Sequence, residues 1–349
     1  MLKAEHLLEM EDFLISLYGI TAPFNLLVFA GLVKNAGKTT ALNIVNSLFP
    51  DEVIGITSIG HDGEALDAIY RHPKPPIEVR PGQLILTAEK FLPASSAGYQ
   101  LLEKWGKHTQ FGSWLILRIQ QAALFRIAGP SSLPELQVGI EKLRLHGAQR
   151  VHVDGALDRL SHLLLKDSGI ILSTGAALGT SLEDVVIRTR YVLELFQLPR
   201  DEDLANTPLD ISQNAYLKEG AWVSLPRFLW THNLKELLPE RVECLYFHGA
   251  FTDKLYQLLL RAKRMPRKIL VYNPCQILLS PNIWQGLKSR NIRLSSLTRP
   301  NLLMLTLNPW HHLTPIATEK LAASILPYAQ VPLVDMHLRK VWIPEKQTQ

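Results

Sequence analysis

Short apolar runs alternate with amphipathic segments along most of this chain, a pattern typical of strands that alternate with helices. Continuous apolar runs predict buried strands at 26–32, 53–60, 150–154 and 169–173. Helical periodicity begins at Lys38, after the first run, and extends to about Leu48. Ser132 with Glu135 three residues later forms a capping box that predicts a helix to about His146. This order predicts an α/β fold with a mostly parallel sheet and helices on both faces.

Other segments between these runs predict shorter elements. An amphipathic helix is expected over 4–17. Residues 77–92 suggest two short strands around Pro81-Gly82, and the segments 114–118 and 123–128 suggest a hairpin. Ser181 and Asp184 predict the start of a helix that extends to about Leu195.

The second half of the chain predicts a separate, smaller α/β domain. Residues 198–217 are polar and contain proline, so we expect a linker there, with domains at 1–197 and 218–349. Strands are expected at 244–250, 268–272 and 302–307, helices at 252–261, 282–288 and 314–326, and an edge strand in the tail VPLVDMHL.

The segment FNLLVFAGLVKNAGKTTALNIV suggests a site for a nucleotide. An apolar strand meets Gly37-Lys38-Thr39-Thr40 where a helix begins. Main-chain amides of such a turn surround phosphates, and the helix directs its positive end at them. We therefore expect Asn35, Ala36, Gly37, Lys38, Thr39 and Thr40 to contact a nucleotide. Lys38 would reach the β- and γ-phosphates, and the Thr39 hydroxyl would bind Mg²⁺. The alternative is an ordinary helix start after a strand.

Hydrolysis also requires a carboxylate that holds Mg²⁺, commonly at the end of a neighbouring strand. Asp154 follows an apolar strand and fits this role, although it would also serve as the cap of a turn. Asp62, after the strand at 53–60, is the competing metal ligand, and Thr57 and Ser58 there would donate to phosphate oxygens. Ser173-Thr174-Gly175 stands where a loop that binds the nucleotide base often lies. Because no Asn-Lys-x-Asp guanine motif occurs, we expect ATP.

Composition narrows the class of protein further. The chain has 349 residues, 47% of them apolar and 20% charged, as expected for a folded globular protein. Its two cysteines form no CxxC pair, and no apolar run is long enough to span a membrane, so we expect a cytoplasmic protein without membrane contact. The net charge of +5 is mild, and the basic run RAKRMPRK lacks interleaved aromatic residues. We expect the solvated end of a helix there and no nucleic-acid partner.

Several segments together resemble one family. They are GLVKNAGKTTALN, TSIGHDGE followed by KPPIEV, VDGALDR and ILSTGAALGTSLEDVV, and more loosely HGAFTD and VPLVD. They are similar to the ATP-binding subunit of the reactivating factor for lysine 5,6-aminomutase, an adenosylcobalamin enzyme, within the P-loop NTPase superfamily. The resemblance covers roughly the first 200 residues and, more loosely, the remainder.

The resemblance implies an ATPase that works with a larger partner subunit and uses hydrolysis to release damaged cobalamin from the mutase. Gly37, Lys38, Thr39 and Thr40 would then contact the nucleotide, and Asp62 or Asp154 would hold Mg²⁺. Lys38 and Asp154 would be the catalytic residues. Two alternatives stay open. One is a kinase or ligase that uses ATP on a small acid, and the other is a scaffold whose loop no longer binds a nucleotide.

Overall fold

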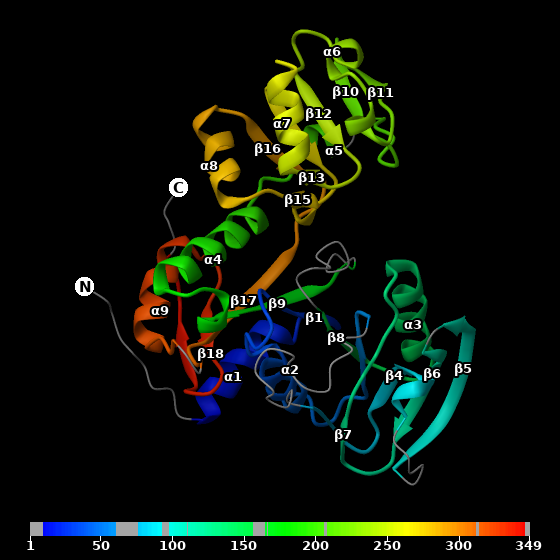
Figure 1. The fold of residues 1–349 in the computed structure, drawn as a ribbon. Coiled ribbons are helices and arrows are strands. Elements are labelled where there is room, and N and C mark those ends of the chain that lie inside the picture. The colour runs from blue at the N-terminus through cyan, green and yellow to red at the C-terminus, as the bar shows by residue number, and fades with distance from the viewer. Residues whose placement is uncertain are drawn as a thin grey trace. The chain divides into compact units, whose positions relative to one another are not determined.

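The computed structural model describes residues 10–60, 76–92, 98–109, 111–155, 165, 167–205, 208–311 and 314–345. The chain forms two compact units. Unit 1 contains residues 1–189 and 301–349, and unit 2 contains residues 190–300. The boundaries between the units therefore fall within one helix and directly before one strand (Figure 1).

Unit 1 is built on a ten-stranded sheet in the order β19-β18-β17-β9-β1-β8-β2-β4-β6-β5. Its strands are β1 (Leu26–Gly31), β2 (Ile54–Ser58), β4 (Leu84–Ala88), β5 (Tyr99–Thr109), β6 (Gly112–Ile119), β8 (Arg150–Asp154), β9 (Gly169–Gly175), β17 (Asn301–Asn308), β18 (Leu333–Asp335) and β19 (Lys340–Trp342). The strands from β18 to β4 in this order run parallel, and β19, β6 and β5 are antiparallel to their neighbours. A separate antiparallel pair joins β3 (Ile77–Val79) to β7 (Ala123–Phe125).

Helices cover both faces of this sheet. They are α1 (Met10–Thr21), α2 (Lys38–Ser47), α3 (Leu133–Leu145), α4 (Leu182–Phe196) and α9 (Thr318–Ile325). Ile54 and Ile56 of β2 share one apolar core with residues of α1 and α2. Gly55, between them, faces the other side, where a Cβ atom would lie 3.1 Å from Leu143 of α3. Because successive residues of a strand point to opposite faces, α3 covers the face opposite to α1 and α2.

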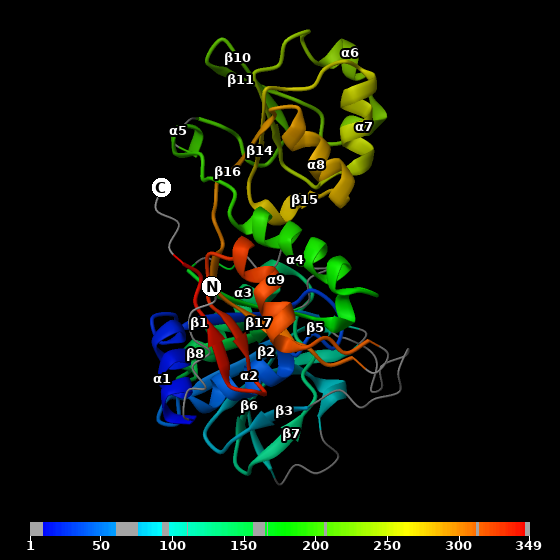
Figure 2. The ribbon, with the colours of Figure 1, turned by 90° about the vertical axis from the view of Figure 1, so that its left-hand side faces the viewer.

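Unit 2 contains a five-stranded sheet in the order β11-β10-β12-β14-β16. Figure 2 labels β10, β11, β14 and β16 of this sheet together with the helices of the unit. Its strands are β10 (Ala215–Lys218), β11 (Ala221–Ser224), β12 (Cys244–Phe247), β14 (Lys268–Val271) and β16 (Arg293–Ser296), with a small parallel pair of β13 (Phe251–Thr252) and β15 (Ile277–Leu278). Its helices are α5 (Glu202–Ala205), α6 (Leu234–Leu237), α7 (Asp253–Arg261) and α8 (Pro281–Ser289). The strands β12, β14 and β16 run parallel, and α7 and α8 connect them in turn.

Several local predictions are confirmed. The α/β class and the mostly parallel sheet are as expected, and α2 begins at Lys38. The Ser132 side chain caps α3 by accepting a hydrogen bond from the Glu135 amide. The Asp184 amide likewise donates to the Ser181 hydroxyl near the start of α4. Two short strands flank Pro81-Gly82, although β3 and β4 belong to different sheets.

Two predictions about how segments associate are wrong. The segments 114–118 and 123–128 do not form a hairpin, because β6 pairs with β4 and β5 while β7 pairs with β3. The expected domain at 218–349 also differs from the structure. Residues 301–349 return to unit 1, where β17 pairs with β9 over seven residues. The apolar run at 302–307 is compatible with a strand in the sheet of either unit. Its pairing with β9 is what assigns it to unit 1.

No helix in the described parts of the chain combines the length and apolarity that crossing a membrane requires.

Candidate nucleotide site at the end of the first strand

The turn between β1 and α2 leaves the start of the helix open. Asn35 and Gly37 both adopt left-handed conformations, with φ of 63° and 90°. Gly37 is the N-cap of α2, and it offers no side chain to the first amides of the helix. An anion that binds at a helix start accepts hydrogen bonds from these amides. The turn therefore leaves the first amides of α2 without a side-chain cap, next to the residues that the sequence predicts as nucleotide contacts.

Lys38 lies across the end of β8. Its Nζ atom is 2.7 Å from Asp154 Oδ1, and it donates a hydrogen bond of 2.7 Å to the carbonyl oxygen of Gly155. Both side chains of the ion pair are 19% exposed. Asp154 Oδ1 is itself buried and accepts no hydrogen bond from another described residue, so the ion pair is its only described polar contact. The structure thus brings the predicted lysine and the predicted metal ligand together.

Strand register explains why these residues meet. Asp154 is the Cα partner of Phe29 in β1 and of Ser58 in β2. The amide of Gly155 donates to the carbonyl of Phe29, and the amide of Ile59 donates to the carbonyl of Asp154. The carboxyl ends of three parallel strands therefore lie at one edge of the sheet, where ligands of such sheets gather.

The remaining predicted contacts lie around the same turn. Ala36 is buried, Asn35 and Thr40 are exposed, and Thr39 is half-buried. The Thr39 hydroxyl makes no hydrogen bond to another residue in the described ranges. Asp62, the competing metal ligand, lies outside the described residues. Thr39 and Asp154 are thus the predicted metal ligands that the structure places.

The hydroxyls expected to contact phosphate or base are instead used within the fold. Thr57 donates to the carbonyl of Leu86, and Ser58 accepts from the amide of Gly129. Ser173 accepts from Thr306, and the hydroxyls of Thr174 and Thr189 are 2.7 Å apart. Ser173 and Thr174 are fully buried. The segment 173–175 is therefore a poor candidate for contact with a base, because its side chains are already paired.

Asn308 is the site residue that the sequence did not indicate. It ends β17, and its side-chain amide donates a hydrogen bond of 2.7 Å to the carbonyl of Asn35 in the turn. A Cβ atom on Gly175 would lie 2.1 Å from the carbonyl oxygen of Asn308, so the end of β9 packs directly against it. The amide of Trp310 donates to Asn308 Oδ1, and the Trp310 side chain is 59% exposed. The predicted phosphate loop is therefore held by a residue 273 positions away.

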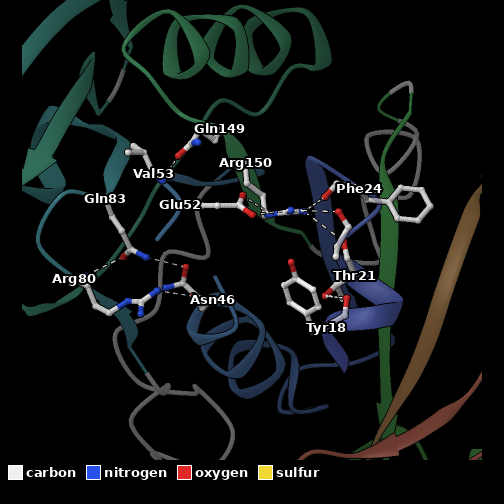
Figure 3. A network of polar contacts seen from close by, with 11 residues as sticks. Tyr18, Thr21, Phe24, Asn46, Glu52, Val53, Arg80, Gln83, Gln149 and Arg150 are labelled. Carbon is white, nitrogen blue, oxygen red and sulfur yellow. Dashed lines mark hydrogen bonds and ion pairs between the residues drawn. The ribbon is translucent and has the colours of Figure 1, made fainter. Parts of the chain in front are cut away.

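A buried arginine fixes the opposite end of the strand that carries Asp154 (Figure 3). Arg150 begins β8 and is 3% exposed. Its guanidinium pairs with both carboxylate oxygens of Glu52, at 3.0 and 3.2 Å, and stacks 3.8 Å from the ring centre of Phe49. It also donates to main-chain carbonyls after α1, including those of Thr21 and Phe24. Arg150 therefore ties the ends of α1 and α2 to β8.

A second polar group ties α2 to β3 and to the residues between β3 and β4, and Figure 3 shows Asn46, Arg80 and Gln83 of this group. Asn46 of α2 donates to the carbonyl of Glu78, and its own carbonyl accepts from Arg80. Gln83 donates to the side chain of Asn46 and accepts from the amide of Arg80. The last turn of the helix that starts at Lys38 is thus tied to β3 and to the residues between β3 and β4.

Comparison with models of protein families gives no match, and neither curated proteins nor solved structures match the chain.

Proposed function

We propose that unit 1 binds ATP at the turn between β1 and α2 and hydrolyses it. The observation that carries the proposal is the pair of Lys38 and Asp154 beside a helix start without a side-chain cap. A cation, a carboxylate that can hold Mg²⁺ and open main-chain amides are among the groups that phosphoryl-transfer sites place around a nucleotide. They come from the helix α2 and from the strand β8, which are more than 100 residues apart in the sequence, so their proximity is a property of the fold.

The donors present fit a Mg²⁺ ion of the kind that nucleotides carry. No group of three acidic, histidine or cysteine residues that would hold a metal occurs among the described residues. Mg²⁺ at phosphate sites needs only one or two protein oxygens, because phosphates and water supply the rest. Thr39 and Asp154 would supply them, and the described polar contact that Asp154 Oδ1 would give up is the ion pair with Lys38. When bound, the metal ion would neutralise charge on the phosphates.

In this proposal, Lys38 exchanges its partner when the nucleotide enters. It leaves the Asp154 carboxylate for the phosphates, and Asp154 is then open to the metal ion. The contacts that Lys38 gives up are the ion pair with Asp154 and the hydrogen bond to the carbonyl of Gly155. A triphosphate offers several charged oxygens in their place, and each charge-assisted hydrogen bond to one of them is worth about 1.5–3 kcal/mol.

The physiological role that we propose follows from the family resemblance. The protein would reactivate an adenosylcobalamin-dependent aminomutase, together with a larger partner subunit, by coupling hydrolysis to release of the damaged cofactor. Hydrolysis by the purified chain would be slow and would increase when the partner protein is added. An increase that requires a small acid instead would indicate a kinase or ligase.

Calorimetric titration of the full chain with ATP, with and without Mg²⁺, tests the site. Lys38→Ala should bind ATP about 10- to 100-fold more weakly, because one charge-assisted contact to phosphate is lost. The matched control is Lys104→Ala, which removes a lysine that is paired with Glu89 elsewhere in unit 1. Equal affinity in Lys38→Ala and Lys104→Ala would remove the assignment.

Asp154→Asn separates the two functions of the site. With Mg²⁺ it should retain ATP binding but lose most hydrolysis, since one metal ligand is weakened. Without Mg²⁺ it should bind ATP about two- to fivefold more tightly than the wild type, because Lys38 no longer leaves an ion pair. Weaker binding of metal-free ATP in this variant would contradict the proposed exchange.

A further inference from the structure

The positive charge of this protein is concentrated in unit 2. Residues 190–300 contain sixteen lysines and arginines against ten acidic residues, a surplus of six, whereas the net charge of the whole chain is +5. Between Asp253 and Glu319 there are ten lysines and arginines and no acidic residue. The mild net charge therefore conceals a strongly uneven distribution.

The fold brings part of this charge together at the amino ends of two neighbouring strands of the sheet in unit 2. Lys263 and Arg267 lie in the connection that leads into β14, and Arg290 and Arg293 lie at the connection that leads into β16. β14 and β16 are parallel neighbours, and Lys268 is the Cα partner of Arg293. The amide of Arg293 donates to the carbonyl of Arg267. We call Lys263, Arg267, Arg290 and Arg293 the basic edge.

The cations of the basic edge are available for a partner. All four residues are exposed, and none forms an ion pair with another described residue. Two neighbouring lysines, in contrast, do form ion pairs. Lys268 pairs with Asp201, and Lys288 pairs with Glu194. Arg290 follows the end of a helix, where a cation is favoured by the helix dipole. That explanation does not extend to Arg267 and Arg293, which belong to no helix.

The surroundings of the basic edge favour a protein over a nucleic acid. A hollow of about 540 Å³ adjoins it, lined by Arg200, Lys268 and Arg293 but also by the exposed carboxylates of Glu202 and Asp203. A nucleic acid would bring uniform negative charge against these carboxylates. A protein surface can place carboxylates opposite the arginines and avoid Glu202 and Asp203. Arginine, three of the four cations here, is also the residue best suited to hold a carboxylate with two hydrogen bonds.

We propose that the basic edge of unit 2 is a docking surface for an acidic peptide segment of a protein partner. The partner would present several Asp or Glu side chains to Arg267, Arg290 and Arg293. This inference is independent of nucleotide binding, since every residue that it uses belongs to unit 2.

Fluorescence anisotropy of the full chain with a labelled twelve-residue Glu/Asp peptide tests the proposal. The triple variant Arg267→Gln, Arg290→Gln and Arg293→Gln should bind about tenfold more weakly than the wild type. Raising NaCl from 50 to 300 mM should weaken wild-type binding and reduce the difference, because salt screens exposed charges. A peptide with Gln in place of Glu and Asp should not bind.

The matched control removes three exposed cations that follow the carboxyl ends of strands in unit 2, whereas the basic edge lies at the amino ends of β14 and β16. Arg227→Gln, Lys254→Gln and Arg299→Gln make the same change in net charge, so the control should bind the acidic peptide within about twofold of the wild type. Equal losses in both triple variants would overturn the proposal, because they would reflect net charge alone. Absence of peptide binding by the wild type would overturn it as well.

A second test looks for tighter binding, because a misfolded variant would bind the peptide more weakly. Glu202→Gln with Asp203→Asn removes the two exposed carboxylates beside the basic edge, so this variant should bind the acidic peptide about two- to fivefold more tightly. A labelled twelve-nucleotide single-stranded DNA is the competing probe. Tighter binding of the DNA than of the peptide by the wild type, lost in the variant at Arg267, Arg290 and Arg293, would assign the edge to nucleic acid instead.

Discussion

His152 is expected to make the stability of unit 1 depend on pH. It lies in the middle of β8, is fully buried, and neither ring nitrogen has a hydrogen-bond partner among the described residues. The rings of Phe29 and Phe49 stand edge-on to it, at centroid distances of 5.5 and 6.3 Å. Burial, followed by the nearby charge of Arg150, lowers the pKa of His152 to about 3. The imidazole is therefore neutral in the folded protein at ordinary pH.

The size of the effect follows from the two pKa values. In the unfolded chain the pKa is about 6.5, so below this pH the unfolded state binds a proton that the folded state does not. His152 therefore causes no loss in the free energy of unfolding above pH 6.5, and the loss that it causes grows as the pH falls from 6.5 towards 3. Each pH unit in this range costs about 1.4 kcal/mol. Between pH 7 and pH 5 the expected loss in the free energy of unfolding is about 2 kcal/mol.

The variant His152→Leu isolates this contribution, because leucine is apolar and of similar size. At pH 7 it should be more stable than the wild type by about 1–3 kcal/mol, since a buried polar group without a partner is removed. At pH 5 its advantage should be about 2 kcal/mol larger. Urea unfolding followed by circular dichroism at both pH values measures the two differences. His232→Leu, which replaces an exposed histidine, is the control and should change the stability little at either pH.

A constant advantage of His152→Leu at pH 7 and pH 5 would refute the reasoning, because it would mean that the folded protein also accepts the proton. Because the other titrating groups are present in both proteins, their contributions cancel in the difference. The comparison therefore measures one side chain, even though acid lowers the stability of the chain in other ways.

Two further predictions concern groups that the fold buries. Arg150→Lys should lower the free energy of unfolding by about 3–5 kcal/mol in urea titrations, because lysine cannot replace the two-oxygen contact with Glu52 or the carbonyl contacts and leaves buried acceptors without donors. Burial raises the pKa of the Cys244 and Cys275 thiols to about 12, so a thiol reagent at pH 8 should label neither cysteine in the folded protein and both in urea. Rapid labelling of either thiol without denaturant would contradict the packing of unit 2.

The sequence predicts those features whose cause is local. The start of α2 at Lys38, the capping of α3 by Ser132 and the end of β8 at Asp154 depend on residues a few positions apart. Each follows from a pattern within the segment itself, which is an apolar run, a capping box or a junction between a strand and a helix. The proximity of Lys38 and Asp154 was also predictable, because the carboxyl ends of parallel strands share one edge of a sheet.

The sequence does not predict features that depend on the choice of partner strand. The run at 302–307 is apolar enough for any buried strand, and nothing within it indicates β9 as its neighbour. The strand Tyr99–Thr109 was missed, and its partner β6 was assigned to a hairpin with β7 instead. The position of Ser173 and Thr174 after a strand predicts contact with a ligand, yet their hydroxyls are paired with Thr306 and Thr189, which come from other segments.

The return of the chain to unit 1 gives the candidate site a property that no local motif could supply. Asn308 contacts the turn through Asn35, and it does so from a strand that follows the whole of unit 2 in the sequence. Asn35 adopts a left-handed conformation, which costs free energy for residues other than glycine, and the hydrogen bond from Asn308 helps to hold it. A chain ending at Pro300 would retain Lys38, Asp154 and every residue of the phosphate-loop pattern, yet it would lack this support. The pattern Gly37-Lys38-Thr39 is therefore insufficient to define the site, and Asn308 belongs to it as much as the residues of the turn do.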